Sequence, residues 1–171
     1  ALALAITPVR LVLVARNRER ARAVAAEVTA HGSPRPEVIL ADLSSLADVR
    51  RAAASCRAAF GRVDVLVNNV GGLFARRRTT VEGHEYTLAL NHLCPFLLTG
   101  LLLPELRATG GRVVNVSSVA HRTARLDLRD LESTRSGMGP FGMGAYGRSK
   151  LMNLLFTYEL ARREAKPGQN T

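Results

Sequence analysis

Short runs of apolar residues alternate along the chain with longer stretches that have helical spacing. The runs lie at residues 10–15, 37–41, 63–67 and 112–118, and helices are expected at 18–30, 45–60, 81–107 and 143–163. The runs are continuous and rich in valine and leucine, which is typical of parallel strands covered on both faces. Four strand-and-helix alternations predict one doubly wound α/β domain of the Rossmann type, in which ligands bind at the carboxyl ends of the strands.

Polar and helix-breaking residues mark the ends of these elements. Asn17 is placed to cap the helix at 18–30, and Ser45 with Asp48 three residues later resembles a capping box. The HGSPRP segment at 31–36 is a predicted turn, and Pro95 is expected to disturb the long helix at 81–107.

The composition is that of a globular protein. Of the 171 residues 47% are hydrophobic and 22% are charged, and we find neither a linker nor a repeat, so residues 1–171 are assigned to a single domain. The net charge is +10, which suits nucleic acid, a membrane or an anionic ligand. Because the arginines are spread along the chain and aromatic residues make up only 5%, nucleic-acid binding is the weakest of the functions considered.

Cysteine use and hydropathy bear on location. Two cysteines, Cys56 and Cys94, are too few for a disulfide framework and are interpreted as reduced thiols. The longest apolar stretch, at 93–103, is too short to cross a membrane, and the first ten residues lack the basic start of a signal peptide. These features predict a soluble cytoplasmic protein without a membrane span, and the four scattered histidines give no metal-binding cluster.

Two polar motifs directly follow predicted strands. In NNVGG at 68–72, glycines permit close backbone approach and the amides can tie loops together. In NVSS at 115–118, hydroxyl groups lie at the end of the next strand. Each motif alone is equally compatible with an ordinary turn or a helix cap.

The pair Tyr146 and Lys150 suggests acid–base chemistry. Of the 24 basic residues only Lys150 and Lys166 are lysine, and Lys150 lies four residues after a tyrosine in a predicted helix, on the same face. A nearby ammonium stabilises the phenolate, so the tyrosine can exchange a proton with an alcohol or ketone oxygen. The other tyrosine in this helix, Tyr158, is followed at the same spacing by Arg162. A chance pair on a solvated helix is the alternative.

Taken in order, these motifs resemble those of the short-chain dehydrogenase/reductase family. The ordered set is Asn-Asn-x-Gly at 68–71, an asparagine in the following helix, Asn-x-Ser-Ser at 115–118 and Tyr-x-x-x-Lys at 146–150. Residues 91–106 and 146–163 look most like the retinol-dehydrogenase-like branch, and so does the long separation between Ser118 and Tyr146 with LDLRDLES inside it. The resemblance extends from about residue 10 to residue 163.

This resemblance implies an NAD(P)-dependent oxidoreductase that interconverts an alcohol and a ketone or aldehyde. It makes Tyr146 the catalytic acid/base. Lys150 then stabilises the phenolate and holds the nicotinamide ribose, and Ser118 orients the substrate oxygen. Asn91 supports a water-linked proton relay. Judged from the residues alone, Asn91 is a buried polar residue of a helix.

The resemblance also implies a cofactor site. Asn68 and Gly71 would line the cofactor cleft together with Tyr146 and Lys150, and Asp42 would contact the adenine, although Asp42 alone is also a turn residue. Arg16 follows the first strand, where NAD-selective enzymes place an acid for the ribose 2′-hydroxyl. An arginine there suits a 2′-phosphate and favours NADP, with NAD as the alternative, unless Arg16 is one more surface arginine.

The chain departs from the family in two places. No Gly-rich turn precedes Leu11, residues 1–5 look like the end of a helix, and the sequence stops after RREAKPGQNT. A central strand should therefore be missing between those at 10–15 and 63–67, which leaves their inner edges unpaired. An inactive remnant that serves as an interaction module thus stays an alternative, and the substrate is unknown. The resemblance further implies a small-molecule carbonyl or alcohol as partner, and a homodimer or homotetramer formed through the helices at 91–103 and 151–158.

Overall fold

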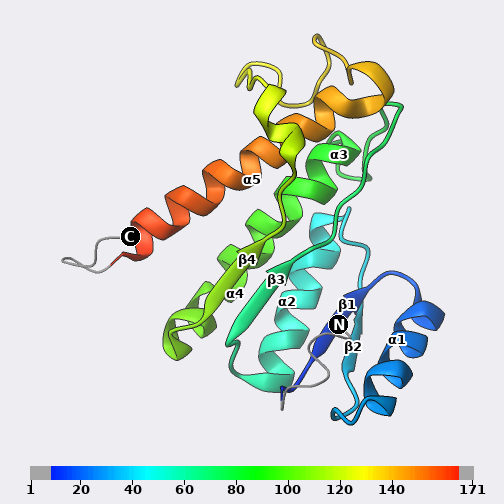
Figure 1. Cartoon of the computed structure of the whole chain (residues 1–171), viewed down its shortest axis with the longest axis vertical. Coiled ribbons are helices and arrows are strands. Elements are labelled where there is room, and N and C mark those ends of the chain that lie inside the picture. The colour runs from blue at the N-terminus through cyan, green and yellow to red at the C-terminus, as the bar shows by residue number, and fades with distance from the viewer. Residues whose placement is uncertain (1–8, 166–171) are drawn as a thin grey trace.

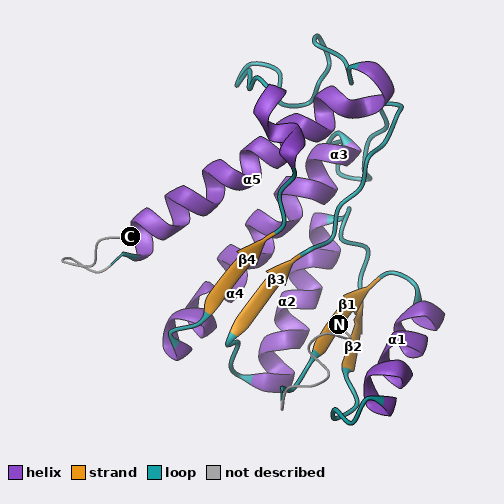
Figure 2. Ribbon diagram, in the orientation of Figure 1, coloured by secondary structure: helices purple, strands orange, loops and turns teal. Residues whose placement is uncertain are grey.

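The computed structural model describes residues 9–165 as alternating strands and helices (Figures 1 and 2). The strands are β1 (Val12–Ala15), β2 (Glu37–Leu40), β3 (Val65–Asn68) and β4 (Arg112–Asn115). The helices are α1 (Arg18–Ala30), α2 (Leu46–Phe60), α3 (Tyr86–Leu88), the π-helical turn η2 (Ala89–Leu93), α4 (Cys94–Thr109), the short 3-10 helices η3 (Val119–Thr123) and η4 (Pro140–Gly142), and α5 (Met143–Glu164). The predicted α/β fold class is confirmed.

The four strands form two separate parallel pairs rather than one sheet. β1 pairs with β2, with Val12 opposite Glu37, and β3 pairs with β4, with Val65 opposite Arg112. Among the described residues no ladder joins β1 to β3, and the two pairs of arrows stand apart in Figure 2. The predicted gap between these strands is thus confirmed for residues 9–165, while the expectation for residues 1–8 lies outside the described residues.

The main core lies between α2, α4 and the strands. Val49 and Ala53 of α2 pack with Leu98 and Leu102 of α4, all at most 7% exposed, and Leu66 of β3 packs against them. The alanines of α2 allow close approach of the leucine-rich α4. On the other strand pair, α1 contributes small and β-branched buried residues, namely Ala21, Ala25 and Val28.

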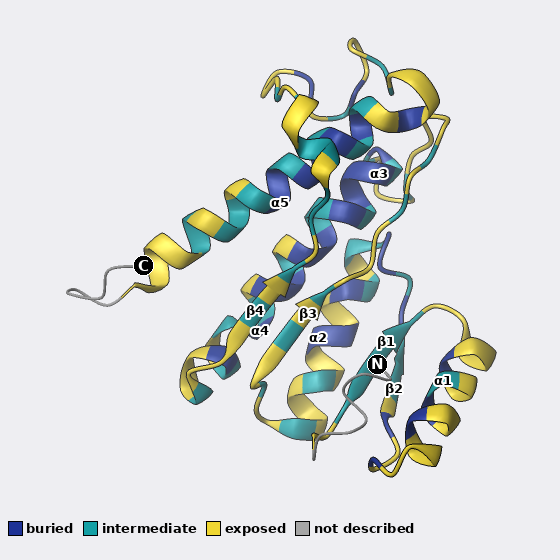
Figure 3. Cartoon of the chain, viewed as in Figure 1, coloured by how far each residue is buried: buried dark blue, intermediate teal, exposed yellow. Residues whose placement is uncertain are grey.

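One face of the β3–β4 pair is open in the described part of the chain. Val65, Val67, Val114 and Val116 point away from the core and are between 38% and 57% exposed, whereas Leu66 lies on the covered face (Figure 3). The apolar runs thus meet helices α2 and α4 on one side, and an uncovered apolar face remains on the other.

The long apolar helix differs from its prediction. It begins at Tyr86 rather than Val81, because the carboxylate of Glu85 caps it by accepting hydrogen bonds from the backbone N–H of Thr87 and Leu88, each at 2.8 Å. Residues 79 and 85 form an isolated antiparallel bridge, so the five residues before the helix belong to a turn. The predicted disturbance near Pro95 takes the form of the π-helical turn η2, after which α4 continues to Thr109.

The other predicted helices are confirmed within a few residues. The side chain of Asn17 accepts a hydrogen bond from the Arg20 N–H at 2.8 Å and so caps α1. The Ser45 hydroxyl accepts from the Asp48 N–H at 3.4 Å, but the Asp48 carboxylate accepts from the Asp42 N–H instead of closing the capping box. Cys56 and Cys94 are free thiols, and burial raises the pKa of Cys94 to about 12.

The segment between η3 and α5 folds back onto the helices. Arg148 of α5 donates hydrogen bonds to the Ser133 hydroxyl and the Gly137 carbonyl, both at 2.7 Å. The Glu132 carboxylate accepts from the Glu85 N–H and lies 3.0 Å from His84 Nδ1. These contacts fix the segment over the beginning of both α3 and α5.

Candidate active site

Tyr146 and Lys150 lie together on the face of α5 that meets the carboxyl end of β4. The Lys150 ammonium is 5.7 Å from the centre of the Tyr146 ring, and its residue is only 4% exposed. Nζ donates a 2.9 Å hydrogen bond to the carbonyl of Val116, just beyond β4. Burial lowers the pKa of Lys150 from its ordinary value of 10.5. The ammonium therefore lies near the tyrosine ring, as the helix spacing predicts.

The end of β4 is fastened to α5 by residues that the sequence analysis did not single out. The Ser117 hydroxyl donates a 2.9 Å hydrogen bond to the backbone carbonyl of Lys150. Gly147 allows the two segments to approach closely, because a Cβ atom at this position would lie 2.8 Å from the Ala120 carbonyl oxygen. The segment that carries Ser118 is thus held against the turn of α5 that carries Tyr146.

Ser118 acts as a helix cap in this structure. Its hydroxyl oxygen accepts a 3.3 Å hydrogen bond from the backbone N–H of Ala120 at the start of η3. No hydrogen bond joins Ser118 to Tyr146 within residues 9–165. Ser118 therefore caps η3, which is one of the two alternatives that the sequence left open. Its catalytic role stays a prediction.

Asn91 connects the loop after β3 to α5. Its side-chain oxygen accepts from the Gly72 N–H at 2.8 Å, and its amide nitrogen donates to the Gly72 carbonyl and to the Ser149 hydroxyl, both at 3.0 Å. A Cβ atom at Gly71 would lie 3.1 Å from Asn91 Oδ1 and 3.3 Å from Lys150 Nζ. The structure thus brings Gly71, Asn91 and Lys150 together, as expected for one site.

The backbone carbonyl of Asn91 also has a partner on α5. Pro95 has no N–H, so it cannot donate to the carbonyl four residues earlier. The Asn153 side chain donates to that carbonyl at 2.9 Å, and its oxygen lies 3.0 Å from His92 Nδ1. Asn153 was not predicted, although residues 146, 150 and 153 have the spacing of one helix face.

Asn68 and Asp42 have structural partners at their strand ends. The amide nitrogen of Asn68 donates to Asn115 Oδ1 at 2.8 Å and to Thr99 Oγ1 at 3.0 Å, which ties β3 to β4 and α4. Asp42 Oδ1 accepts from both the backbone N–H and the hydroxyl of Ser44, at 2.9 and 2.8 Å. Asp42 is therefore a turn residue, as one of the two alternatives predicted. Contact of Asn68 or Asp42 with a cofactor stays a prediction.

Arg16 lies exposed just after β1, at the far strand pair from Tyr146. Its Nη1 donates a 3.3 Å hydrogen bond to the hydroxyl of Tyr86, the first residue of α3. Arg16 is thus at the carboxyl end of a parallel strand, where the sequence placed it.

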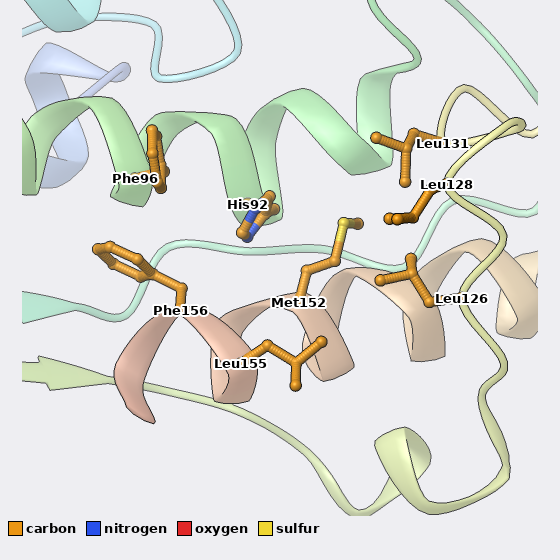
Figure 4. Close-up of a pocket in the computed structure, with 8 residues that line it drawn as sticks. All are labelled: His92, Phe96, Leu126, Leu128, Leu131, Met152, Leu155 and Phe156. Carbon is orange, nitrogen blue, oxygen red and sulfur yellow. The ribbon is translucent and has the colours of Figure 1, made fainter. Parts of the chain in front are cut away.

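An apolar pocket lies between the helical segment formed by η2 and α4, helix α5 and the segment 126–131 (Figure 4). Figure 4 shows side chains from both helices and the segment pointing into it: His92, Phe96, Leu126, Leu128, Leu131, Met152, Leu155 and Phe156. It contains none of the predicted catalytic or cofactor-binding residues. Burial lowers the pKa of His92, which hydrogen-bonds to Asn153.

The sequence pattern of short chain dehydrogenases matches residues 1–127. The chain belongs to this family. Dehydrogenase/reductase SDR family member 13 of Bos taurus is 42% identical over 94% of this chain and 42% of its own length. Retinol dehydrogenase 11 of Homo sapiens is 38% identical over 95% of this chain and 51% of its own length. The chain spans about half the length of such curated relatives.

A solved structure carries the same fold. The crystal structure of a metagenomic short-chain oxidoreductase in complex with NADP superposes with a TM-score of 0.73, at 32% identity, over 95% of this chain and 70% of that one. The resemblance recognised from the ordered motifs is therefore confirmed at the level of the family.

The prediction of a cytoplasmic location is wrong. It is contradicted by the relatives named retinol dehydrogenase and SDR family member 13. The separate expectation that no segment spans a membrane rested on the shortness of the apolar stretch at 93–103. The π-helical turn instead joins α3 to α4 into one helical segment, Tyr86–Thr109. By length and composition this 24-residue segment could cross a membrane, although 56% of its most apolar window is buried inside the fold.

Proposed function

We propose that this short-chain dehydrogenase is an NADP-preferring oxidoreductase that interconverts an alcohol and a ketone or aldehyde, with Tyr146 as the acid/base. The observation that carries the proposal is the buried Lys150 ammonium beside the Tyr146 ring. A cation in so dry a position stabilises a phenolate more strongly than it would in water, because the local dielectric constant is low. Tyr146 is thereby suited to donate a proton to a bound substrate oxygen or to accept one from it.

The residues around Lys150 fit a nicotinamide cofactor. An ammonium has three N–H donors, and the Val116 carbonyl takes one of them, which leaves two for a ribose hydroxyl and the phenol. A side chain at Gly71 would crowd both Asn91 and Lys150, so this glycine keeps the approach to the ammonium open. When bound, the nicotinamide supplies or accepts the hydride.

Proton transfer falls to the protein side chains. In the reductive direction the Tyr146 hydroxyl gives its proton to the carbonyl oxygen, and Lys150 stabilises the phenolate that remains. Ser118 Oγ accepts from the Ala120 N–H, so its own O–H stays available to donate to the substrate oxygen. Asn91 fixes the loop after β3 against α5 through Gly72 and Ser149, which holds Lys150 in place for the reaction.

Support for NADP and for the substrate class comes from different sources. Arg16 offers a guanidinium at the end of β1, which suits a 2′-phosphate, and a 32% identical solved relative was crystallised with NADP. Several relatives are named retinol dehydrogenases, so retinal and other apolar aldehydes and ketones are the first substrates to test.

The test compares Tyr146→Phe with Tyr158→Phe in the complete protein. NADPH oxidation with retinal and a panel of ketones should fall by about 100-fold to 10,000-fold in Tyr146→Phe, the usual contribution of a positioned general acid. Tyr158 is 71% exposed on the same helix and its variant should keep full activity. Turnover by Tyr146→Phe at more than a tenth of the wild-type rate refutes the assignment. A complete protein that binds NADPH but reduces no carbonyl favours the inactive remnant instead.

We also propose that two copies associate through the outer face of α4 and α5. Phe96 and Leu155 on this face are 54% and 50% exposed, and both line the apolar pocket of Figure 4. Exposed apolar area of this kind favours burial against a second surface.

A further inference from the structure

Two arginine side chains converge on one tyrosine at the end of β1. Arg16 Nη1 donates to the Tyr86 hydroxyl at 3.3 Å. The guanidinium of Arg78 lies over the ring of the same tyrosine, with Cζ 3.7 Å from the ring centre. Two positive charges therefore lie against one side chain, although β1 and the loop after β3 supply them separately.

Arg78 is held in a corner formed by two aromatic rings. Its Cζ is also 4.5 Å from the centre of the Phe74 ring, and the rings of Phe74 and Tyr86 meet edge to face at 4.8 Å and 87°. Stacking uses the flat face of a guanidinium and leaves the N–H groups along its edge free. Within residues 9–165 no acceptor hydrogen-bonds to the Arg78 side chain, so these donors are available to a ligand.

The backbone that carries Arg78 is also fixed. The Tyr86 N–H donates to the Arg78 carbonyl at 2.9 Å, which joins the two ends of the turn before α3. Inside that turn the Glu82 carboxylate accepts from the Ser45 hydroxyl at 2.8 Å and from the Ala47 N–H at 3.3 Å, which fastens the turn to the start of α2. Arg78 is thus positioned by both its main chain and its side chain.

The charge of this pair is uncompensated. Arg10, Arg51 and Arg107 each form an ion pair with a carboxylate, whereas in the described part of the chain neither Arg16 nor Arg78 does. Two cations that face one phenol repel each other, and a dianion between them removes that repulsion. Guanidinium groups bind both carboxylate and phosphate in a bidentate manner, and of the two only a phosphate monoester carries two negative charges.

We infer that Arg78 and Arg16 together form the site for the 2′-phosphate of NADP, so that Arg78 is a second residue that selects the cofactor. The inference rests on the proposed function for the dinucleotide. Arg16 approaches from the end of β1 and contacts the hydroxyl of Tyr86, and Arg78 approaches from the aromatic corner and contacts the ring of the same residue. NAD lacks the 2′-phosphate and gains nothing from either arginine.

The experiment measures the binding of adenosine 2′,5′-bisphosphate, adenosine 5′-monophosphate and inorganic phosphate to the full chain. The variants are Arg78→Gln, Arg16→Gln and the matched control Arg76→Gln, which removes the same charge from the same arginine run. All three arginines are exposed, so the fold should be retained, and circular dichroism checks this.

The wild type should bind the bisphosphate about tenfold or more tightly than the monophosphate, the effect of about one charge-assisted hydrogen bond. Arg78→Gln and Arg16→Gln should each remove most of that preference, and Arg76→Gln should keep it. The inference is overturned if the wild type shows no preference, if Arg76→Gln and Arg78→Gln behave alike, or if inorganic phosphate binds as tightly as the bisphosphate. None of these measurements needs turnover. A protein without activity would therefore contradict the proposed function but would leave the phosphate site to be decided by the binding measurements.

Discussion

The side-chain amide of Asn153 on α5 donates a 2.9 Å hydrogen bond to the backbone carbonyl of Asn91 in the π-helical turn η2. That carbonyl lacks its usual partner because Pro95, four residues later, has no N–H. Asn153 on α5 therefore supplies the donor that Pro95 on α4 cannot supply. The side chain of the same residue, Asn91, hydrogen-bonds to both the N–H and the carbonyl of Gly72. The irregular turn and the candidate site are connected through this bond.

Asn153→Leu should destabilise the fold by about 1–3 kcal/mol, since it leaves a buried carbonyl without a donor at nearly constant side-chain volume. Asn69→Leu makes the same chemical change at an exposed position and should change the free energy of unfolding by less than about 0.5 kcal/mol. Urea denaturation of both variants gives the comparison. Equal stability of the two variants would mean that the Asn91 carbonyl finds water or another donor.

Gly147→Ala should also destabilise the fold, because its Cβ atom would lie 2.8 Å from the backbone oxygen of Ala120. Neither α5 nor η3 can yield by rotating a side chain, so a backbone shift costing about 1–3 kcal/mol is expected. In Gly100→Ala, which is also inside a helix, the new Cβ atom meets nothing within 4 Å. That control should stabilise the fold by about 0.5–1 kcal/mol through higher helix propensity. Thermal unfolding that ranks the variants the other way round would contradict the close packing of α5 on η3.

His92 should make stability depend on pH. Burial lowers the pKa of His92 in the folded state, against about 6.5 in an unfolded chain. The unfolded state therefore binds more protons, so this contribution is complete above about pH 6.5 and is lost as the pH falls towards the folded value. The neighbouring groups, Asn153, Phe96 and Phe156, carry no charge that would offset the added proton.

In His92→Gln the loss of unfolding free energy between pH 7.5 and 5.5 should be smaller than in the wild type. The difference is at most about 1.4 kcal/mol per pH unit below 6.5. Urea denaturation at the two pH values measures it, and NMR titration of the histidine ring reports the folded pKa directly. Identical pH dependence in the two proteins would show that His92 titrates as it does in water.

Local patterns predicted most of the fold and the centre of the candidate site. Strand and helix periodicity depends on residues close in sequence, and the contact between Tyr146 and Lys150 follows from the pitch of one helix. The start of α3 was misplaced by five residues because Glu82 and Glu85 hydrogen-bond in a turn that α2 and the segment around Glu132 hold in place. Such contacts join residues more than 30 positions apart, and no local pattern encodes them.

The partner of Asn91 was missed for the same reason. Asn153 lies 62 residues from the carbonyl it satisfies, and its position three after Lys150 indicates a helix face but not what that face meets. The gap between β1 and β3 among the described residues, by contrast, was predicted, because no Gly-rich turn precedes Leu11 in the order of motifs. The order of motifs along the chain therefore predicted the strand pairing better than it predicted the buried polar contacts.

Association through α4 and α5 predicts that polar substitutions on their outer face shift the protein towards the monomer. Phe96 is 54% exposed and Leu155 50% exposed, and both line the pocket of Figure 4, so a partner surface would bury them together. Phe96→Ser with Leu155→Ser should raise the dimer dissociation constant by about tenfold or more, because each apolar side chain contributes roughly 1.5–3 kcal/mol when buried. Val81→Ser removes an apolar side chain that is 91% exposed in the turn before α3, and it should leave the dissociation constant unchanged. Sedimentation of the complete protein at micromolar concentration makes the measurement. A wild-type protein that sediments as a monomer at these concentrations, or a Val81→Ser effect as large as that of the double variant, would place the exposed apolar residues of α4 and α5 outside any interface between copies.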